Sequence, residues 1–137
     1  MTTADTRPPH SLESELAHFM GDLQRYRSIS PRLIYTPGVR HLAQEAGAHW
    51  LIDAIASYVD SDRLRKAIRK DERVRYLHFW NLTVNDDGSA VLTARIDRDE
   101  APFIRQAIEF TDFLLSSIDL WCGFNGESYT LYLPSEH

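Results

Sequence analysis

The chain has 137 residues, of which 43% are hydrophobic and 26% charged, and this balance excludes the disordered, collagen-like and low-complexity classes. Its single cysteine, Cys122, excludes an internal disulfide and any zinc site built from several cysteines. No apolar run reaches the roughly 18 residues of a membrane span, and the polar N-terminus is unlike a signal peptide. We therefore expect a cytoplasmic protein with a flexible tail over residues 1–10 and one domain over residues 11–137.

The net charge of −5 is unevenly distributed along the chain. Residues Arg63 to Arg75 include seven basic side chains against two acidic ones, so this segment carries +5 and the remainder −10. We call residues 63–75 the basic strip. A basic strip on an acidic body favours contact with an anionic partner at one place only.

Three helices are predicted in the N-terminal half. The first runs from a cap at Ser11 toward residue 26, with apolar residues at helical spacing. Thr36-Pro37 is a start signal for the second, because threonine accepts from a free amide and proline at the first position loses no hydrogen bond. This helix carries an apolar stripe over residues 39–58, in which Gly47 predicts a kink or a close contact. A short basic helix, Ser61–Lys70, follows.

The pattern then changes to the two-residue period of strands. Five antiparallel strands are predicted, at 74–84, 90–96, 103–110, 118–124 and 127–133. Asn85–Gly88 forms one hairpin turn, and Asn125-Gly126 predicts a type I′ turn with two positive φ angles. The sequence therefore predicts an α+β domain whose N-terminal helices pack on one face of an antiparallel sheet of about five strands.

Several short motifs resemble those of one known family. They are Tyr35-Thr36-Pro37-Gly38-Val39, Gly47–Asp53, Trp80–Val84, Phe110–Phe113 and Leu133–Glu136. In this order they resemble an uncharacterised bacterial domain family of unknown function, often found on plasmids and other mobile DNA. The chain departs from that family at Pro37, His49 and Leu114. The resemblance implies a shared fold and a mobile-element context, and it implies no activity.

Periodicity explains one group of motif residues poorly. These residues are Tyr35, Thr36, Trp50, Asp53, Asp112, Ser135 and Glu136. An aspartate within an apolar helix, such as Asp53, needs a partner if it is buried, and Thr36 and Ser135 are the expected donors. We favour a structural polar knot that ties the C-terminus to the central helix over the alternative, a ligand pocket. Trp50 is expected in the core of the domain.

Four possible metal ligands recur every four residues in the central helix: His41, Glu45, His49 and Asp53. Neighbours at this spacing can share an ion, but His41 and His49 would lie about 12 Å apart along one helix. A third ligand such as His78 would have to come from the sheet. We therefore interpret these residues as a polar ridge and expect neither a metal nor a cofactor.

Catalytic motifs find little support. The chain has no G-x-S-x-G elbow and no glycine-rich phosphate loop. Cys122 lies within a predicted strand, where a buried and inert thiol is usual. The acidic residues between Asp97 and Glu100 lack the spacing of a calcium loop and indicate a solvated turn. We expect a protein that is not an enzyme.

The basic strip is the candidate partner surface. Its exposed cations are predicted to be Arg65, Lys66, Arg69, Lys70 and Arg73. They can contact an anionic partner, or they can form a solvated helix face. The nearby aromatic residues Tyr76, His78 and Trp80 could stack on bases, although Leu82 and Val84 share their face and favour core packing.

The sequence favours a small non-catalytic protein that binds a protein partner, as an accessory of a mobile element with a host-interference role. The first alternative is a nucleic-acid module that uses the basic strip and binds weakly. The second alternative is an enzyme of unknown reaction. No membrane partner is expected.

Overall fold

The computed structural model describes residues 9–19 and 24–137. Within these ranges the chain forms an α+β fold with five α-helices and a seven-stranded sheet, and the predicted fold class is confirmed. The helices are α1 (Pro9–Ala17), α2 (Pro37–Glu45), α3 (His49–Val59), α4 (Asp62–Lys70) and α5 (Arg73–Tyr76). The strands are β1 (Tyr26–Arg27), β2 (Leu33–Tyr35), β3 (Leu77–Val84), β4 (Ala90–Arg95), β5 (Ile104–Ile108), β6 (Ser117–Phe124) and β7 (Tyr129–Tyr132). A 3₁₀ turn, η2 (Pro134–Glu136), follows β7.

The N-terminal segment differs from the prediction at both ends. Most of the expected tail, residues 1–8, lies outside the described residues, as do residues 20–23 of the expected first helix. Helix α1 begins at Pro9 and ends at Ala17, and Tyr26 lies in a strand. Ser30 starts the turn between β1 and β2, because its carbonyl accepts from the Leu33 amide at 3.2 Å. The two strands are only two and three residues long, too short to produce a two-residue period in the sequence.

The predicted central helix is two helices. Gly47 ends the first with a φ of +62°, a left-handed conformation that costs glycine little. The Ala48 amide donates to the Ala43 carbonyl at 2.8 Å and the Ala46 amide to the Leu42 carbonyl at 2.9 Å, which closes α2 with a Schellman-type turn. The chain can therefore change direction before α3, and the kink expected at Gly47 is a complete break.

The sheet has the order β1-β2-β7-β6-β3-β4-β5, and seven strands replace the five expected. All neighbours are antiparallel except β2 and β7, which are parallel, so the sheet is mixed. The parallel pair brings residues 33–35 beside residues 129–131, with Leu33 opposite Tyr129 and Tyr35 opposite Leu131. No local sequence pattern specifies such a long-range pairing.

Two local predictions need correction. The strand expected from Val74 begins at Leu77, because residues 73–76 form the short helix α5, in which buried Val74 fits a helical as well as an extended spacing. The turn at Asn125-Gly126 has one positive φ, at Gly126, so it is not type I′. The Asn125 side chain accepts from the amides of Glu127 and Ser128, both at 2.9 Å, and this holds a different turn.

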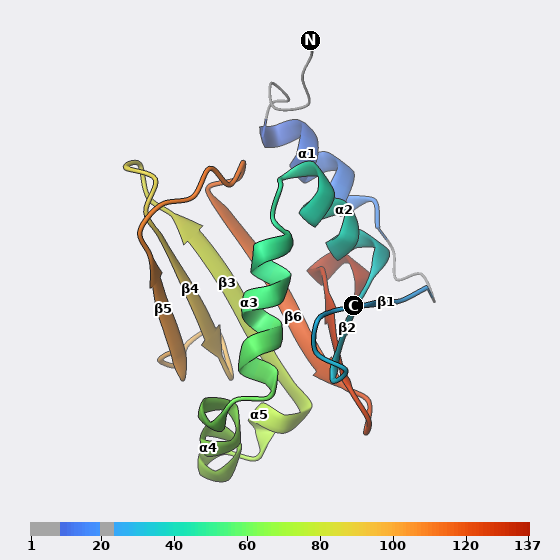
Figure 1. The fold of residues 1–137 in the computed structure, drawn as a ribbon, viewed down its shortest axis with the longest axis vertical. Coiled ribbons are helices and arrows are strands. Elements are labelled where there is room, and N and C mark those ends of the chain that lie inside the picture. Colours follow the sequence, from blue (N-terminus) through green and yellow to red (C-terminus); the bar gives the residue numbers. More distant parts are fainter. Residues whose placement is uncertain (1–8, 20–23) are drawn as a thin grey trace.

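Helices α2 and α3 cover one face of the sheet, with α3 crossing in front of β3 and β6, whereas α4 and α5 lie at one end (Figure 1). The core fills the space between α3 and the sheet, where Leu51 and Ile55 from the helix and Trp80 and Leu120 from the sheet are each at most 2% exposed. On the opposite face, Phe79 and Trp121 are half-buried. None of the described helices has the length and apolar character that crossing a bilayer requires.

Candidate functional site

The polar knot forms at the N-terminus of α2. The Thr36 hydroxyl donates to Glu136 Oε1 at 2.6 Å and accepts from the Val39 amide at 3.3 Å, so it caps the helix. The Glu136 carboxylate also accepts from the amides of Leu133 (2.9 Å) and Gly38 (3.3 Å). A carboxylate at this position compensates the partial positive charge of the helix end.

Position 38 of this knot leaves little room for a side chain. A β-carbon there would lie 2.6 Å from Leu133 Cδ1 and 2.7 Å from Glu136 Oε1, closer than atoms pack. Two of the motifs quoted above, at residues 35–39 and 133–136, therefore meet in one structural contact. Their residues hold the C-terminus against the start of α2.

The other residues of the expected cluster lie elsewhere. Ser135 donates to the Leu16 carbonyl at 3.2 Å and so joins the C-terminus to α1. Asp53 and Asp112 are exposed, so Asp53 needs no buried donor. Trp50 is half-buried at the start of α3 and packs at the edge of the core rather than within it. Tyr35 is half-buried on β2, with its ring 5.8 Å from that of Tyr26.

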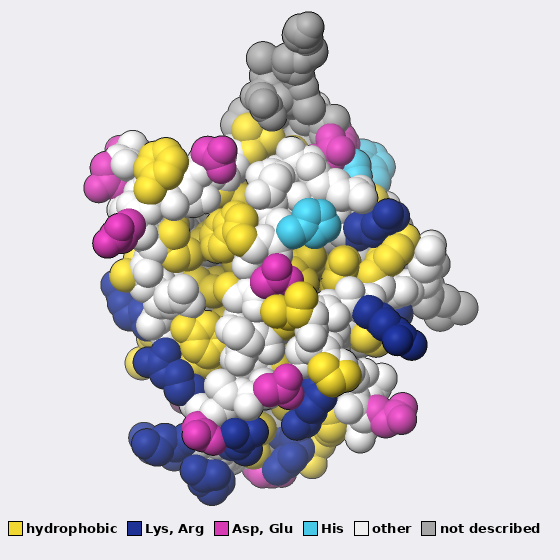
Figure 2. Space-filling model, viewed as in Figure 1, with side chains coloured by type: hydrophobic (Ala, Val, Ile, Leu, Met, Phe, Trp, Pro, Cys, Tyr) yellow, Lys and Arg dark blue, Asp and Glu magenta, His cyan; other side chains and the backbone are white. Residues whose placement is uncertain are grey.

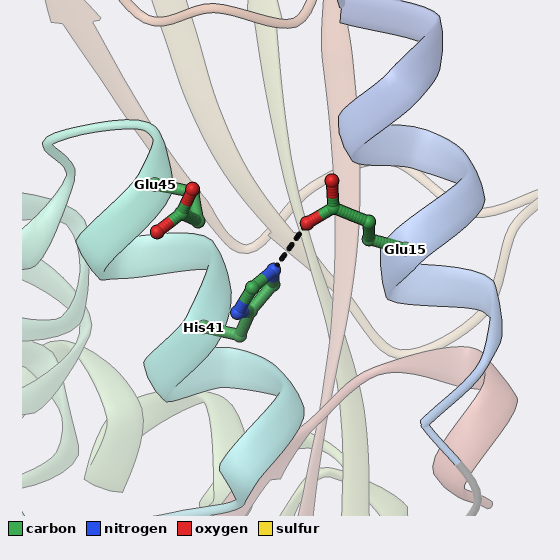
Figure 3. A group of neighbouring side chains, drawn as sticks. All are labelled: Glu15, His41 and Glu45. Atoms are coloured by element: carbon green, nitrogen blue, oxygen red, sulfur yellow. Dashed lines mark hydrogen bonds and ion pairs between the residues drawn. The ribbon is translucent and has the colours of Figure 1, made fainter. Parts of the chain in front are cut away.

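The four spaced ligand candidates are separated by the helix break. His41 and Glu45 lie on α2, whereas His49 and Asp53 are exposed on α3. Glu15 of α1 approaches the first pair, and its Oε1 lies 2.7 Å from His41 Nε2 (Figure 3).

His78, named above as the kind of third ligand that the sheet would have to supply, is fully buried in the core. Its Nδ1 donates to the Val74 carbonyl at 3.0 Å, and its ring lies 5.6–5.9 Å from those of Trp80, Phe103 and Tyr129. Burial lowers the pKa of His78 to about 4, because the charged imidazolium would lose its water. His78 therefore stays neutral at pH 7.

Cys122 is buried next to His78, on the paired strand β6. Burial raises the pKa of this thiol far above its ordinary value, so it does not ionise. The side chain packs in the core, and its environment suits neither a nucleophile nor a metal ligand.

The basic strip covers α4 and α5 at one end of the molecule, where lysine and arginine side chains gather (Figure 2). Ser61 caps α4, as predicted, by accepting from the Leu64 amide at 3.3 Å. Among the described residues, exposed Arg63, Lys66, Arg69 and Lys70 form no ion pair, so four cations face solvent there.

Three other arginines of the strip, Arg65, Arg73 and Arg75, are paired with acids. Arg65 contacts Asp62 at 2.5 Å, and Arg75 contacts Glu72 at 2.7 Å. Arg73 contacts Asp71 at 2.7 Å and Glu100 at 3.2 Å, and Glu100 belongs to the loop between β4 and β5. These pairs neutralise much of the charge that the sequence places in the strip.

An aromatic row crosses the face of the sheet opposite to α3, which we call the open face. Phe79 of β3, Trp121 of β6 and Tyr132 of β7 are neighbours on this face, because they are paired in register. The ring centroids of Phe79 and Trp121 are 5.2 Å apart, and those of Trp121 and Tyr132 are 6.1 Å apart. His137 completes the row at 4.8 Å from Trp121. We call these four residues the aromatic row.

One end of the aromatic row borders a hollow of about 500 Å³. Its charged and amide side chains are Asn81, Arg95, Asp97, Arg98, Asp99 and Asp119. Asn81 donates to Asp119 Oδ1 at 2.8 Å, which orients this carboxylate beside the rings. Arg95 donates to the Glu100 carbonyl at 3.1 Å and the Thr93 hydroxyl at 3.0 Å. The hollow combines aromatic walls with three carboxylates and two guanidinium groups.

The sequence carries a signal for this surface, although none of the predicted sites includes it. The strand pattern assigned His78 and Trp80 to one face, and their burial confirms the core packing favoured there. The alternate residues of the same strand, Phe79 and Asn81, then had to point the other way. The strand pattern does not indicate that this face is open, because the number and placement of the helices decide which face of the sheet they cover.

Comparison with known proteins identifies relatives without an assigned activity. The profile of a family of unknown function (DUF6876) matches residues 10–137. No curated protein matches the chain. A crystal structure of a protein of unknown function from Enterococcus faecalis is similar at 17% sequence identity, with a TM-score of 0.48, over 85% of this chain and 93% of that one. The family match agrees with the resemblance in the sequence in that both lead to a family of unknown function.

Proposed function

The chain belongs to this family of unknown function, DUF6876, and membership assigns it no activity. From the geometry of the structure, we propose that the protein is a non-catalytic binding protein. Its partner would be a protein segment that carries an arginine or lysine side chain. The observation that supports this proposal is the hollow beside Phe79 and Trp121, where aromatic rings and the Asp119 carboxylate share one exposed surface.

The chemistry of the hollow suits a cation on an organic side chain. Aromatic faces attract ammonium and guanidinium groups, and a neighbouring carboxylate adds a charge-assisted hydrogen bond. Three carboxylates against two guanidinium groups leave the lining with a formal charge of −1, on a chain of net charge −5. A phosphate would be repelled where a cationic segment is attracted.

The role of an accessory protein of a mobile element, with host interference as its purpose, belongs to the same proposal. It is supported by the resemblance noted in the sequence. A host protein with an exposed basic segment is the partner class that fits both this role and the hollow.

A displayed library of random peptides, panned against the purified protein, tests the preference. We expect enrichment of peptides that contain arginine or lysine, and weaker binding of these peptides to Asp119→Asn and Phe79→Ala variants. Thr130→Ala is the matched control, because Thr130 lies on the same face of the sheet, on β7, and outside the hollow. Enrichment of acidic peptides, or equal binding by the Asp119→Asn variant, would contradict the proposal.

The basic strip supports a second candidate function, the binding of nucleic acid. The observation that favours it is the group of exposed cations Lys66, Arg69 and Lys70 on one short helix. Contacts to phosphates alone would make such binding dependent on salt and nearly independent of sequence, with a log–log salt slope of about −3 on duplex DNA for three contacts. Fluorescence anisotropy with labelled duplex and single strands at two salt concentrations measures this. Sub-micromolar binding at physiological salt, lost on charge reversal at Arg69 and Lys70, would make it the leading function.

A further inference from the structure

Three side chains that commonly bind metal ions meet between α1 and α2. Glu15 comes from α1, whereas His41 and Glu45 lie one turn apart on α2 (Figure 3). One ligand atom of each lies within 4.8 Å of the other two. We propose that these three residues form a binding site for one zinc ion. The proposal is independent of the proposed function, because the site lies on the helices and not on the open face of the sheet.

The donor set is one that zinc accepts. An imidazole nitrogen and two carboxylate oxygens, with a water in the fourth position, complete a tetrahedral shell. Zinc bonds of 2.0–2.2 Å place neighbouring donors roughly 3.3 Å apart. The His41–Glu15 separation of 2.7 Å is shorter than that value, and the ligand atoms of all three residues lie within 4.8 Å of one another, so binding would require the side chains to rotate to the spacing of the ion. Zinc would replace the hydrogen bond between His41 Nε2 and Glu15, and the ring would then carry its proton on Nδ1.

The backbone holds the two helices ready for such an ion. His41 and Glu45 project from one face of α2, which is fixed by Thr36 at its start and by Gly47 at its end. Helix α1 is anchored by Leu12 and Leu16, which are 0% and 6% exposed. Little chain entropy would therefore be lost on binding.

The surroundings of His41 are partly apolar. The Phe19 ring lies 5.3 Å from the His41 ring and limits the access of water on that side. His41 and Glu15 retain 29% and 37% side-chain exposure, which leaves an entry path for the ion. The three ligand residues are partly shielded from water but remain accessible on one side, and both properties are typical of zinc sites.

The sequence could supply only two of these ligands, because α2 alone brings two donors to one ion. Glu15 lies 26 residues earlier and joins them only through the packing of α1 on α2. His49 and Asp53 continue the four-residue spacing of His41 and Glu45 in the sequence, but the break at Gly47 separates them from the site. They therefore provide matched controls.

Calorimetric titration of the untagged protein with zinc chloride tests the site. We expect one ion per chain for the wild-type protein, and binding weakened at least about tenfold by His41→Gln, Glu45→Gln or Glu15→Gln, since loss of even an outer-shell partner costs roughly 10–100-fold. His49→Gln and Asp53→Asn should bind as the wild-type protein does. Circular dichroism of each variant establishes that it is folded.

Two further measurements sharpen the outcome. Cobalt should produce the strong visible absorption of a four-coordinate ion in the wild-type protein and in His49→Gln, and not in His41→Gln. Zinc should raise the midpoint of thermal unfolding of the same two proteins only. The absence of zinc binding by the wild-type protein, or equal binding by His41→Gln, would overturn the proposal.

Discussion

The two faces of the sheet use the same strands for different purposes. On the covered face, His78, Trp80 and Leu82 of β3 are at most 1% exposed and pack beneath α3. On the other face, Phe79 and Asn81 of the same strand are half-buried at the surface and border the hollow. Adjacent residues of β3 thus have different roles: those on the covered face stabilise the fold, and those on the open face form part of the candidate binding surface.

This comparison shows why a large aromatic residue is not by itself evidence of a core or of a binding site. Trp80 and Trp121 are both tryptophans in long strands of one sheet, yet Trp80 is buried and Trp121 faces the open side. The period of the strand separates them, and the placement of the helices gives each face its role. Substitutions of neighbouring residues on β3 can test that division.

The largest expected effect comes from Trp80→Ala on the covered face. Because Trp80 is 1% exposed and among the largest buried side chains, its removal should lower the free energy of unfolding by about 3–5 kcal/mol. Phe79→Ala, the adjacent residue on the open face, should cost less than about 2 kcal/mol, because the ring is already partly hydrated. Urea unfolding curves of the three proteins measure both values. Equal losses would mean that the two faces are equally packed.

A smaller effect is expected from the protonation of His78. The pKa of about 4 in the folded protein lies below the ordinary value of about 6.5, so the unfolded chain takes up the proton first as the pH falls. The free energy of unfolding should therefore decrease on acidification, by about 2 kcal/mol between pH 7 and pH 5. Urea unfolding at several pH values measures this. A His78→Leu variant should lose that part of the pH dependence, and an unchanged pH profile would show that His78 is not the titrating group.

The knot at α2 should contribute less than the core. Thr36→Ala removes the cap and one hydrogen bond to Glu136, and we expect a loss of about 1–2 kcal/mol. Thr36→Ser keeps the hydroxyl and should stay within about 0.5 kcal/mol of the wild-type protein. Thermal unfolding of both variants distinguishes the two results. If serine were as damaging as alanine, packing of the methyl group would matter more than the hydrogen bonds.

The smallest effect on stability should come from Asp119→Asn on the open face. The side chain is exposed and its contact with Asn81 can be kept by an amide, so the free energy of unfolding should change by less than about 0.5 kcal/mol. The same variant should lose affinity for cationic peptides. Chemical unfolding and peptide binding on one preparation measure both. A large loss of stability would assign Asp119 to the fold rather than to a binding surface.

Local signals in the sequence determined much of the fold. The Thr36-Pro37 and Ser61 caps, the two-residue period of β3 and the hairpin after Val84 each depend on residues close together in the chain. Such features follow from hydrogen-bond geometry and hydrophobic spacing over one or two turns. The α+β class followed from their order, helices before strands.

Only the tertiary structure decided the contacts between distant segments. The pairing of β2 with β7, the bond from Thr36 to Glu136 and the approach of Glu15 to His41 join residues 26 to 100 positions apart. The tertiary structure also decided which face of the sheet is open. The alternation of side chains in β3 indicates that the strand has two faces, but it does not indicate which face the helices cover. Long-range packing fixes these choices, since the free energy that selects them comes from burial summed over the whole domain and not from any one segment.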